Sequence, residues 1–460
     1  MSEINDNAGS TRRELLQKSA VTVAAGVAAT TVSHMPATAE GMARVIGAND
    51  RINVGHIGIG VQGTLHLRLI KENSKEGLTN NTDQIGVCDI YTRARKGGQA
   101  TLGIKDSQTY DDHRKLLENK DIDAVWVTTS DQWHAPITID AVQAGKHVYC
   151  EKPMTRTIEE AFAVFDAVKK SGKIFQIGSQ GTSDGKHHAV GAMVKSGKIG
   201  KLIVGQDSYC RADNKKGEWN DYRKIDPDAA PTASGDAFIN WDVFCKGKKT
   251  PWDPDRFFHW RKWWDYGSGL MGDLLPHRLH PLMYAMAIPL EGEGGFPQRV
   301  SSTGGLYVQK INPASGKPDR EVPDFMNLMV DFGDFSLMAM TSCVTEQGWP
   351  SMIRGNKATI VYNGGNIELK PEHNYTDEID GDSTPAPGPT EDIRIHEKNF
   401  LDCIRSNKPT NGNIDLATRV QVMVSLGELS YRQGHTYHFN AKTRSYGTSP
   451  ITASAPGKKA

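Results

Sequence analysis

The sequence predicts an α/β protein with an N-terminal Rossmann domain, a doubly wound parallel sheet, followed by a C-terminal α+β domain with a mostly antiparallel sheet. Two observations support this fold class. Short apolar strands alternate with helical segments up to about residue 180, as in a parallel sheet with helices on both faces. Beyond about residue 200 the alternation ends, and two long strand-like runs follow a hairpin pattern, Phe325–Phe332 and Phe335–Cys343.

The individual elements are predicted from runs of apolar residues and from the turn residues that bound them. Strands are predicted at Ile52–Gly58, Gln84–Asp89, Ala124–Thr129, His147–Cys150 and Lys173–Gly178. Helices are predicted after the first strand and at Ala135–Ala144, Ile158–Ser171, Arg394–Ile404 and Leu416–Arg432. The Pro-rich stretch Ser383–Pro389 is expected to form a surface loop.

These patterns divide the chain into four parts. Residues 1–39 form a leader, residues 40–180 the domain of alternating strands and helices, residues 181–440 the second domain, and residues 441–460 a polar tail. The 54 basic residues balance 54 acidic ones, which argues against nucleic acid as a partner because phosphate binding needs a surplus of Lys and Arg. After the leader, no stretch is long and apolar enough to predict a membrane span.

The first 39 residues have the features of an export signal. Arg12 and Arg13 precede an uncharged run from Ser19 to Ser33, and the Ala-Thr-Ala sequence at 37–39 suits a signal peptidase. The paired arginines resemble a twin-arginine signal, which predicts export of the folded protein to the periplasm. Two alternatives remain open: a flexible tail with a chance arginine pair, or a segment that stays uncleaved as an anchor.

A glycine motif follows the first strand. Gly58, Gly60 and Gly63 form the pattern G-x-G-x-x-G between a strand and a helix. In that context the glycines allow a tight turn and let the backbone approach a dinucleotide pyrophosphate, which the helix N-terminus then binds. The same pattern at 267–272 has no apolar strand before it and is interpreted as a turn.

Asp89 ends the second strand, where a carboxylate would bind the ribose hydroxyls of a dinucleotide. Because a carboxylate repels a 2′-phosphate, the predicted cofactor is NAD, and NADP is the less favoured one. Arg93, Arg95 and Lys96 follow closely, and they either soften this preference or form the solvated face of the next helix.

Further motifs resemble one family of oxidoreductases. The chain combines the glycine loop, the Thr-Thr that ends the third strand, Ala-Gly-Lys-His-Val before Glu-Lys-Pro at 151–153, and Asp273-x-x-x-His277. Together these motifs are similar to the glucose–fructose oxidoreductase, inositol dehydrogenase and MocA family over about residues 50–440. The resemblance implies a Rossmann domain and an antiparallel α/β domain with a nicotinamide held between them, in a homo-oligomer.

The resemblance also implies roles for single residues. Thr128, Glu151 and Lys152 would bind the cofactor. Lys152, Asp273 and His277 would form the catalytic set, in which His277 suits a general base for the hydroxyl proton and Lys152 suits stabilisation of alkoxide character. The alternatives are that Lys152 is a surface lysine, Asp273 a helix cap and His277 a core histidine.

One part of the second motif departs from the family pattern. Many members have Asp-x-Gly-x-His-x-x-Asp, whereas this chain has His280 in place of the second Asp. Pro276 and Pro281 cannot both lie in the first turn of a helix, so the helix is expected to be kinked or to begin near Pro281. His280 is therefore a candidate that shares or replaces the role of His277.

Aromatic residues are concentrated at 257–265, before this motif. Rings stack on sugar faces while polar groups bind hydroxyls, so Trp260, Arg261 and Trp264 are candidate substrate-binding residues. The alternative is that these tryptophans form the core of the second domain. His134 follows the third strand, at the edge where ligands bind, and is a further candidate or else a helix cap. No metal site is predicted, because no cysteine pair has the spacing of a zinc site.

The export signal and the Rossmann domain together predict how the cofactor is used. Free nicotinamide cofactor is scarce outside the cytoplasm, so we expect NAD to be carried out bound and regenerated in place. The predicted activity is oxidation of a sugar or polyol hydroxyl, with a second carbonyl compound taking the hydride. One alternative is a glycoside hydrolase or lyase that oxidises its sugar transiently, as in the NAD-dependent family 109 glycoside hydrolases. Another is a sugar-binding protein with a vestigial cofactor site.

Overall fold

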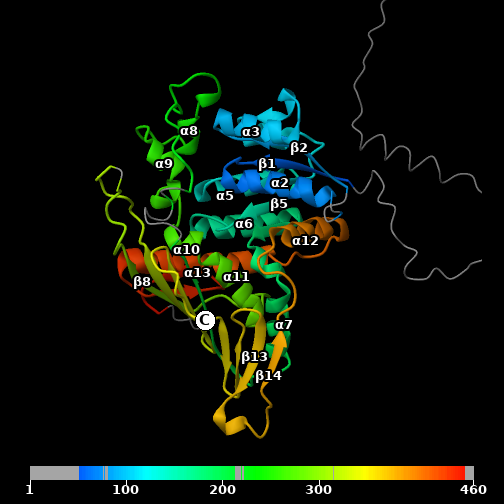
Figure 1. Cartoon of the computed structure of the whole chain (residues 1–460), viewed down its shortest axis with the longest axis vertical. Helices are drawn as coiled ribbons and strands as arrows, with labels where there is room; N and C mark the ends of the chain where they lie inside the picture. Colours follow the sequence, from blue (N-terminus) through cyan, green and yellow to red (C-terminus); the bar gives the residue numbers. More distant parts are fainter. Residues whose placement is uncertain are drawn as a thin grey trace, which may run out of the picture. The chain divides into compact units, whose positions relative to one another are not determined.

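The computed structural model describes residues 51–75, 77, 81–212, 219, 222–313 and 315–450. The predicted export signal lies outside these residues. Two sheets organise the described chain, and helices pack on their faces (Figure 1). Among the described residues, no helix combines the length and the apolar character that crossing a membrane requires.

The first sheet is parallel, with the strand order β3-β2-β1-β4-β5-β6. Its strands are β1 (Ile52–Ile57), β2 (Thr82–Cys88), β3 (Thr109–Tyr110), β4 (Ala124–Val127), β5 (His147–Glu151) and β6 (Phe175–Gly178). The described helices are α2 (Val61–Lys75), α3 (Thr92–Leu102), α4 (His113–Glu118), α5 (Asp131–Gln143), α6 (Ile158–Ser171), α7 (Gly185–Lys195), α8 (Trp241–Phe244), α9 (Pro254–Phe258), α10 (Gly269–Asp273), α11 (Pro276–Ala285), α12 (Ile393–Ser406) and α13 (Ile414–Gln433). The predicted Rossmann sheet is confirmed. The two-residue strand β3 was not predicted, because a run that short has no periodicity.

The strands of this sheet are apolar throughout because both faces are covered. On β4, Ala124 and Trp126 pack with residues of α2 and α12. The intervening Val125 and Val127 pack with residues of α4, α5 and α6 on the other face. Parallel strands of this kind end at a common edge, so the residues that follow β1, β4 and β5 meet there.

Helix α6 shows how local signals set the element boundaries. The Thr157 side chain accepts a hydrogen bond from the N–H of Glu160, and the Glu160 side chain accepts one from the N–H of Thr157, which completes a capping box. Gly172 ends the helix in the left-handed conformation, with φ of 64°. The helix therefore begins and ends where the sequence predicts.

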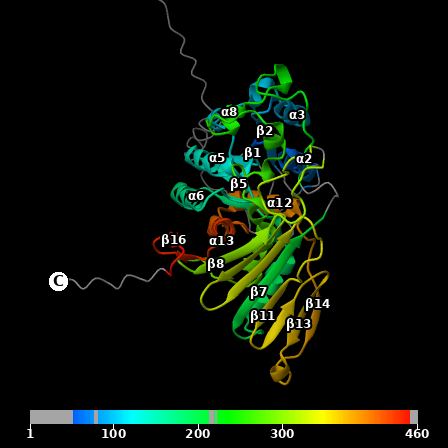
Figure 2. The same ribbon diagram turned by 90° about the vertical axis from the view of Figure 1, so that its left-hand side faces the viewer.

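The second sheet has the order β14-β13-β12-β11-β7-β10-β9-β8-β15-β16 (Figure 2). Its strands are β7 (Leu202–Cys210), β8 (Arg299–Gly305), β9 (Phe325–Asp331), β10 (Ser336–Ser342), β11 (Met352–Gly355), β12 (Ala358–Val361), β13 (Asn366–Pro371), β14 (Asp382–Pro385), β15 (Tyr437–Asn440) and β16 (Ser445–Gly447). Only β7 and β10 pair in parallel among them, so the predicted mostly antiparallel sheet is confirmed, with its β9–β10 hairpin. The loop predicted at 383–389 is wrong at its start, because β14 is an exposed edge strand that tolerates proline.

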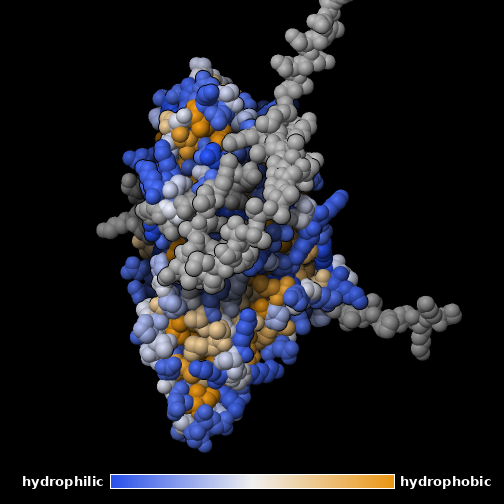
Figure 3. All heavy atoms as spheres, turned by 90° about the vertical axis from the view of Figure 1, so that its right-hand side faces the viewer, coloured by the Kyte–Doolittle hydropathy of each residue, from blue (hydrophilic) through white to orange (hydrophobic). Residues whose placement is uncertain are grey.

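One face of the second sheet is covered by α10, α11 and α13. Met326, Leu328 and Val330 of β9 belong to the core that these helices form with the sheet. The opposite side is more open, with Met329 46% exposed and Ile203 45% exposed. On the side of the molecule drawn in Figure 3, apolar residues are exposed in patches mainly over the lower part, where the C-terminal domain lies.

Two segments depart from the predicted domain limits. Helix α12 comes late in the chain but packs on the Rossmann sheet, where the ring of Phe400 lies 5.2 Å from that of Trp126. The predicted polar tail is wrong for residues 445–447, because β16 pairs with β15 at the edge of the second sheet. Tyr446 there donates a hydrogen bond of 2.7 Å to Glu159.

Residues 222–268, which we call the clamp segment, run from the second domain onto the first. Ile239 forms a β-bridge with Tyr91, just after β2. The carbonyl oxygen of Phe244 accepts a hydrogen bond of 3.3 Å from the indole of Trp133 in α5. In Figure 1, α8 and α9 of this segment lie in the upper part of the molecule, at the level of the Rossmann domain. The clamp segment therefore fixes the second domain against the edge where the parallel strands end.

The region of the second motif is helical in two pieces. Residues 269–273 form the short helix α10, so the turn predicted for the second glycine pattern is wrong. Helix α11 starts at Pro276, and Pro281 lies inside it, which excludes the alternative of a helix that begins near Pro281 and leaves that of a kinked helix. Pro276 lies at the first helical position, where its missing N–H costs nothing. Asp273 and His277 therefore lie on successive helices rather than on one helical face.

Candidate active site

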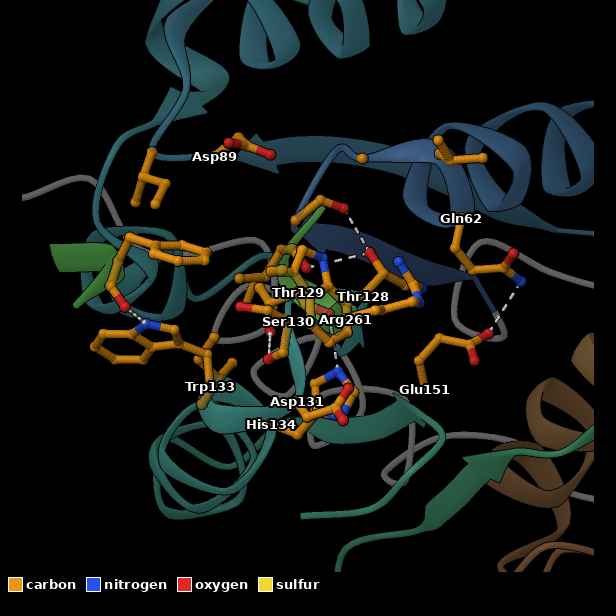
Figure 4. Close-up of a pocket in the computed structure, with 18 of the residues that line it drawn as sticks. Gln62, Asp89, Thr128, Thr129, Ser130, Asp131, Trp133, His134, Glu151 and Arg261 are labelled. Atoms are coloured by element: carbon orange, nitrogen blue, oxygen red, sulfur yellow. Dashed lines mark hydrogen bonds between the residues drawn. The ribbon is translucent and has the colours of Figure 1, made fainter. Parts of the chain in front are cut away.

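A cavity of about 480 Å³ opens where the parallel strands end. The residues after β1, β4 and β5 line one side, and the clamp segment, β7, α10 and α11 line the other. Figure 4 shows Asp89, Thr128, Asp131, Glu151 and Arg261 among the lining residues. Of the predicted site residues, those that line it are Gly58, Gly60, Asp89, Thr128, His134, Glu151, Lys152, Trp260, Arg261, Asp273 and His277. Within the described part of the chain, no group of three His, Cys, Asp or Glu side chains is arranged to hold a metal ion.

The glycine loop has the close contacts that a dinucleotide cradle requires. Gly58 has φ of 93°, and a Cβ atom there would lie 2.8 Å from the backbone of Thr128. A Cβ on Gly63 would collide with the carbonyl oxygen of Gly58, so Gly63 allows α2 to pack against the loop. A Cβ on Gly60 would meet nothing nearer than Nη1 of Arg223, at 4.0 Å. The space above Gly60 and the N-terminus of α2 therefore fits a pyrophosphate.

Asp89 is held at the end of β2 by two backbone donors. Its carboxylate accepts hydrogen bonds from the N–H groups of Ile59, at 2.6 Å, and Tyr91, at 2.7 Å. Burial raises the pKa of Asp89, and the two backbone N–H groups oppose that shift. The side chain lines the cavity beside the glycine loop, where it fits the ribose hydroxyls of a dinucleotide.

The basic residues that follow Asp89 point elsewhere. Arg93 forms ion pairs with Asp226 and Asp236 of the clamp segment, and Arg95 donates a hydrogen bond of 2.6 Å to the backbone oxygen of Asp89. Arg93, Arg95 and Lys96 do not line the cavity. These three side chains are thus not placed to bind a 2′-phosphate in the cavity, and the carboxylate of Asp89 fits NAD.

Glu151 connects the cavity to a buried polar cluster. It accepts hydrogen bonds from Gln62, at 3.1 Å, and from Nε2 of His66, at 2.9 Å. The other ring nitrogen of His66 donates to Glu397 of α12 at 2.6 Å. Burial alone would lower the pKa of His66, but the hydrogen bonds to the two glutamates outweigh it and raise the pKa to about 9. A buried imidazolium therefore holds Glu151 in place.

Lys152 and Asp273 form an ion pair across the two domains. Lys152 Nζ lies 3.2 Å from Asp273 Oδ1 and also donates to the Asp273 backbone oxygen. Arg261 Nε donates to Oδ1 at 2.9 Å, and the indole of Trp219 donates to Oδ2 at 3.0 Å. Burial would raise the pKa of Asp273, but Lys152 and Arg261 hold it well below its usual range. Asp273 is therefore an ionised anchor for two cations and a weak base.

His277 completes the predicted set in the same cavity. Its ring centre lies 5.2 Å from that of Tyr209, which also lines the cavity. Burial lowers the pKa of His277 well below its ordinary value, and the nearby Lys152 adds to this effect. The imidazole is therefore neutral at pH 7 and has a free lone pair, but it is a weaker base than an ordinary histidine.

Asp131 is a functional candidate that the sequence analysis did not select. It is 3% exposed, lines the cavity at the first turn of α5, and accepts a hydrogen bond of 3.1 Å from the N–H of Ser268. Burial raises its pKa to about 7, and the charge on Asp273 adds to the shift. Its position after β4 was the available signal, because polar residues at the carboxyl ends of parallel strands face ligands. His134, three residues on, has its ring nitrogens 2.7 Å from the oxygen of Pro153 and 3.1 Å from that of Thr129.

Two predicted substrate-binding residues lie away from the cavity. The Nδ1 of His280 lies 2.9 Å from the carbonyl oxygen of Pro276 within α11, and the side chain is buried, so it does not replace His277. Trp264 packs beside the core of the second domain, under Arg432 at 4.9 Å. Neither side chain lines this cavity, and a one-dimensional pattern does not show which face of an irregular segment turns inward.

Two arginines complete the lining, and neither carries a sequence signal. Arg211 follows β7, and Arg223 belongs to the clamp segment. The guanidinium of Arg223 lies 5.1 Å from the ring centre of Phe258 and 5.7 Å from that of Tyr91. Both come from stretches that are far in sequence from the glycine loop, so only the fold brings them to it.

Comparison with known proteins gives partial matches. Residues 52–179 match the family model described as oxidoreductase family, NAD-binding Rossmann fold, named GFO_IDH_MocA. Inositol 2-dehydrogenase of Salmonella paratyphi B is 31% identical over 154 residues, which are 33% of this chain and 44% of that protein. A glycosyl hydrolase family 109 protein of Shewanella sp. is 27% identical over 213 residues, 44% of this chain and 46% of its own. The chain thus spans less than half the length of these curated relatives.

Solved structures extend the likeness to the second domain at the level of the fold. Levoglucosan dehydrogenase in complex with NADH and levoglucosan has a TM-score of 0.62 at 18% identity, covering 87% of this chain and 100% of its own. Aldose-aldose oxidoreductase of Caulobacter crescentus has a TM-score of 0.59 at 17% identity, covering 84% and 99%. The two-domain architecture is therefore shared, and residues 52–179 match the NAD-binding Rossmann fold of the Gfo/Idh/MocA oxidoreductase family.

Proposed function

We propose that the chain is an NAD-dependent oxidoreductase that acts on a hydroxyl group of a sugar or polyol. The observation that carries this proposal is the ion pair between Lys152 and Asp273, 3.2 Å long, in the cavity that begins at the glycine loop. Gly58, Gly60, Gly63, Asp89, Thr128 and Glu151 would hold the cofactor. Relatives and structural neighbours named as sugar and polyol dehydrogenases support the substrate class.

The side chains of the cavity have complementary roles in the proposed oxidation. Bound NAD would supply a hydride acceptor for the carbinol carbon, and the neutral ring of His277 would accept the hydroxyl proton. The Lys152 ammonium donates a hydrogen bond to the substrate oxygen as it gains negative charge. Asp273 remains ionised, holds Lys152 and orients it. Trp260 forms part of the wall beside the bound sugar.

We further propose that NAD stays bound and is recycled in place. The clamp segment supports this proposal, because Arg223, Phe257 and Phe258 line the cavity from the second domain. A second carbonyl compound would take back the hydride and the proton that His277 carries, which restores both the oxidised cofactor and the neutral imidazole. Such a cycle needs no free nucleotide.

The proposed location is the periplasm, reached by the twin-arginine route. This rests on Arg12 and Arg13 and on the small residues at 37–39. A cofactor that the folded protein retains would be exported with it. The proposed assembly is a homo-oligomer that pairs through the open side of the second sheet, where Met329 and Ile203 are exposed.

A second candidate is a glycoside hydrolase or lyase. Relatives named glycosyl hydrolase family 109 protein, 27–29% identical over about two fifths of this chain, favour it. In that reaction, oxidation of a sugar hydroxyl acidifies a neighbouring C–H, loss of that proton expels the aglycone, and addition of water and return of the hydride restore a sugar. The same Lys152, Asp273 and His277 would act on the hydroxyl.

The decisive experiment is to purify the protein, denature it, and identify the released nucleotide by mass and absorbance. We expect about one NAD or NADH per chain, and bound NADH that is oxidised when a carbonyl acceptor is added after a sugar. Aryl glycosides added to the same preparation distinguish the second candidate by release of the aglycone. Protein that carries no nucleotide, binds added NAD only weakly and transfers no hydride would overturn the proposal.

A further inference from the structure

Arg261 is a rigidly held cation at the substrate end of the cavity. Its guanidinium carbon lies 4.3 Å from the ring centre of Trp260 and 4.8 Å from that of Tyr222, and Nε donates to Asp273. Within the part of the chain that the structure describes, no hydrogen-bond partner contacts Nη1 or Nη2. These two nitrogens form a planar pair of donors, oriented before any ligand arrives.

Lys152 and Arg261 lie at the same end of the cavity and share one carboxylate, that of Asp273. Asp273 is ionised, because Lys152 and Arg261 hold its pKa down, whereas burial raises the pKa of the neighbouring Asp131 to about 7. Asp273 therefore serves two cations at once, and it binds only the Nε of Arg261. An anionic ligand that reaches Nη1 and Nη2 would give this guanidinium a second charged partner.

The pyrophosphate of the cofactor is not the anion that Arg261 would bind. A Cβ on Gly60 would lie 4.0 Å from Nη1 of Arg223, so Arg223 covers the glycine loop where the pyrophosphate fits. The N-terminus of α2 adds positive potential there. Arg261 instead contacts Asp273, the residue that also holds Lys152.

We propose that the substrate is a sugar acid, whose carboxylate binds Arg261 while the hydroxyl that is oxidised contacts Lys152. This inference rests on the proposed function and adds the substrate class. The flat guanidinium matches a carboxylate with two parallel hydrogen bonds. Stacking between Trp260 and Tyr222 limits the side-chain entropy that binding would otherwise lose. A neutral sugar leaves the two donors without an anion.

Matched pairs of ligands test the charge requirement. Glucuronate and glucose, and galacturonate and galactose, differ only at C6, and each is titrated calorimetrically into the purified nucleotide-containing protein. We expect the acid of at least one pair to bind about tenfold or more tightly than its neutral partner, since hydrogen bonds to charged groups are the stronger ones. Added salt should weaken binding of the acid and leave the neutral sugar nearly unchanged.

A pair of variants tests the residue. Arg261→Gln should reduce the affinity for the acid to that for the neutral sugar, with the nucleotide content and Tm preserved. Arg256→Gln is the matched control, because Arg256 lies on the same segment, stacks on Trp263 at 4.4 Å, and does not line the cavity. It should keep the preference for the acid.

The outcomes separate this inference from the proposed function. Equal or tighter binding of the neutral sugars would overturn the proposal that the substrate is a sugar acid, even if hydride transfer is observed. An unchanged preference for the acid in Arg261→Gln would overturn it too. Tighter binding of glucose 6-phosphate than of glucuronate would overturn the proposal that Arg261 recognises a carboxylate. Conversely, Arg261-dependent binding of the acid without hydride transfer to or from any sugar would support the inference and contradict the proposed oxidoreductase.

Discussion

Lys152 at the end of β5 and Asp273 at the end of α10 are 121 residues apart in sequence, yet the lysine Nζ lies 3.2 Å from the aspartate Oδ1. This pair joins the Rossmann domain to the second domain inside the cavity. Each side chain is only 11% exposed, so water screens their attraction weakly. The pair therefore adds a buried contact between the domains and helps to keep Asp273 ionised.

Replacement of Lys152 by Ala should lower turnover by roughly 10²–10³-fold, because it removes the donor that faces the developing negative charge. The nucleotide content should be retained, since the glycine loop is unchanged. The measurement is the rate of hydride transfer in a single turnover, together with the nucleotide released on denaturation. Lys198→Ala, at an exposed lysine outside the cavity, is the control. An unchanged rate of hydride transfer in Lys152→Ala would show that Lys152 takes no part in the reaction.

Affinity for a sugar acid should depend on pH through Asp131. Its pKa of about 7 lies above the ordinary value, so the carboxyl binds a proton below pH 7 and loses it above. Ionisation adds a negative charge beside the ligand carboxylate, and affinity should fall between pH 6 and pH 8. Burial lowers the pKa values of His277 and His134, so neither adds a proton-binding step in this window.

Asp131→Asn isolates this effect, because the amide keeps the shape and does not ionise. Its affinity for the acid, measured calorimetrically across the same range, should be flat and close to that of the wild type at pH 6. A variant with the original decrease would assign the titration to another group.

Stability should fall at alkaline pH through His66. Its pKa is about 6.5 when unfolded and about 9 when folded, so the stabilising contribution is complete below pH 6.5 and disappears as pH rises through 9. The free energy of unfolding should decrease by about 3 kcal/mol over this range. Urea unfolding of wild type and Glu397→Gln tests it, since loss of one carboxylate should lower the pKa of His66 and flatten the profile. If the stability of both proteins changes with pH in the same way, a group other than His66 causes the pH dependence.

The glycine loop should tolerate a methyl group at one position and not at another. Gly58→Ala places Cβ 2.8 Å from the Thr128 backbone at φ of 93°, so we expect a loss of about 1–2 kcal/mol or more and little bound nucleotide. Gly60→Ala has room in the protein but projects toward the cofactor, so it should keep Tm and lose nucleotide. Gly97→Ala, with nothing within 4 Å, should change neither. Equal nucleotide content in all three would contradict the cradle.

The sequence predicts those site residues that belong to short motifs, and it misses those that only the packing of distant segments brings to the cavity. Gly58 and Lys152 belong to short motifs beside buried strands, and periodicity places such strands well. Asp273 and His277 were selected by a resemblance, but the proline positions alone left the helix start open, and the structure places it at Pro276. Arg223 carries no pattern, since its role comes from the packing of an irregular segment onto β2.

Retention of the cofactor should depend on Arg223. Its guanidinium lies over the glycine loop and beside the rings of Tyr91 and Phe258, which fix it there. Arg223→Ala removes that cation from the expected pyrophosphate position and leaves the cradle intact, so nucleotide should dissociate at least about tenfold faster. The rate is measured by exchange of bound nucleotide for a labelled one, with the exposed neighbour in Lys224→Ala as control. Faster exchange in Arg223→Ala alone would mean that the clamp segment keeps the cofactor bound, whereas equal exchange in both variants would mean that the Rossmann domain retains it unaided.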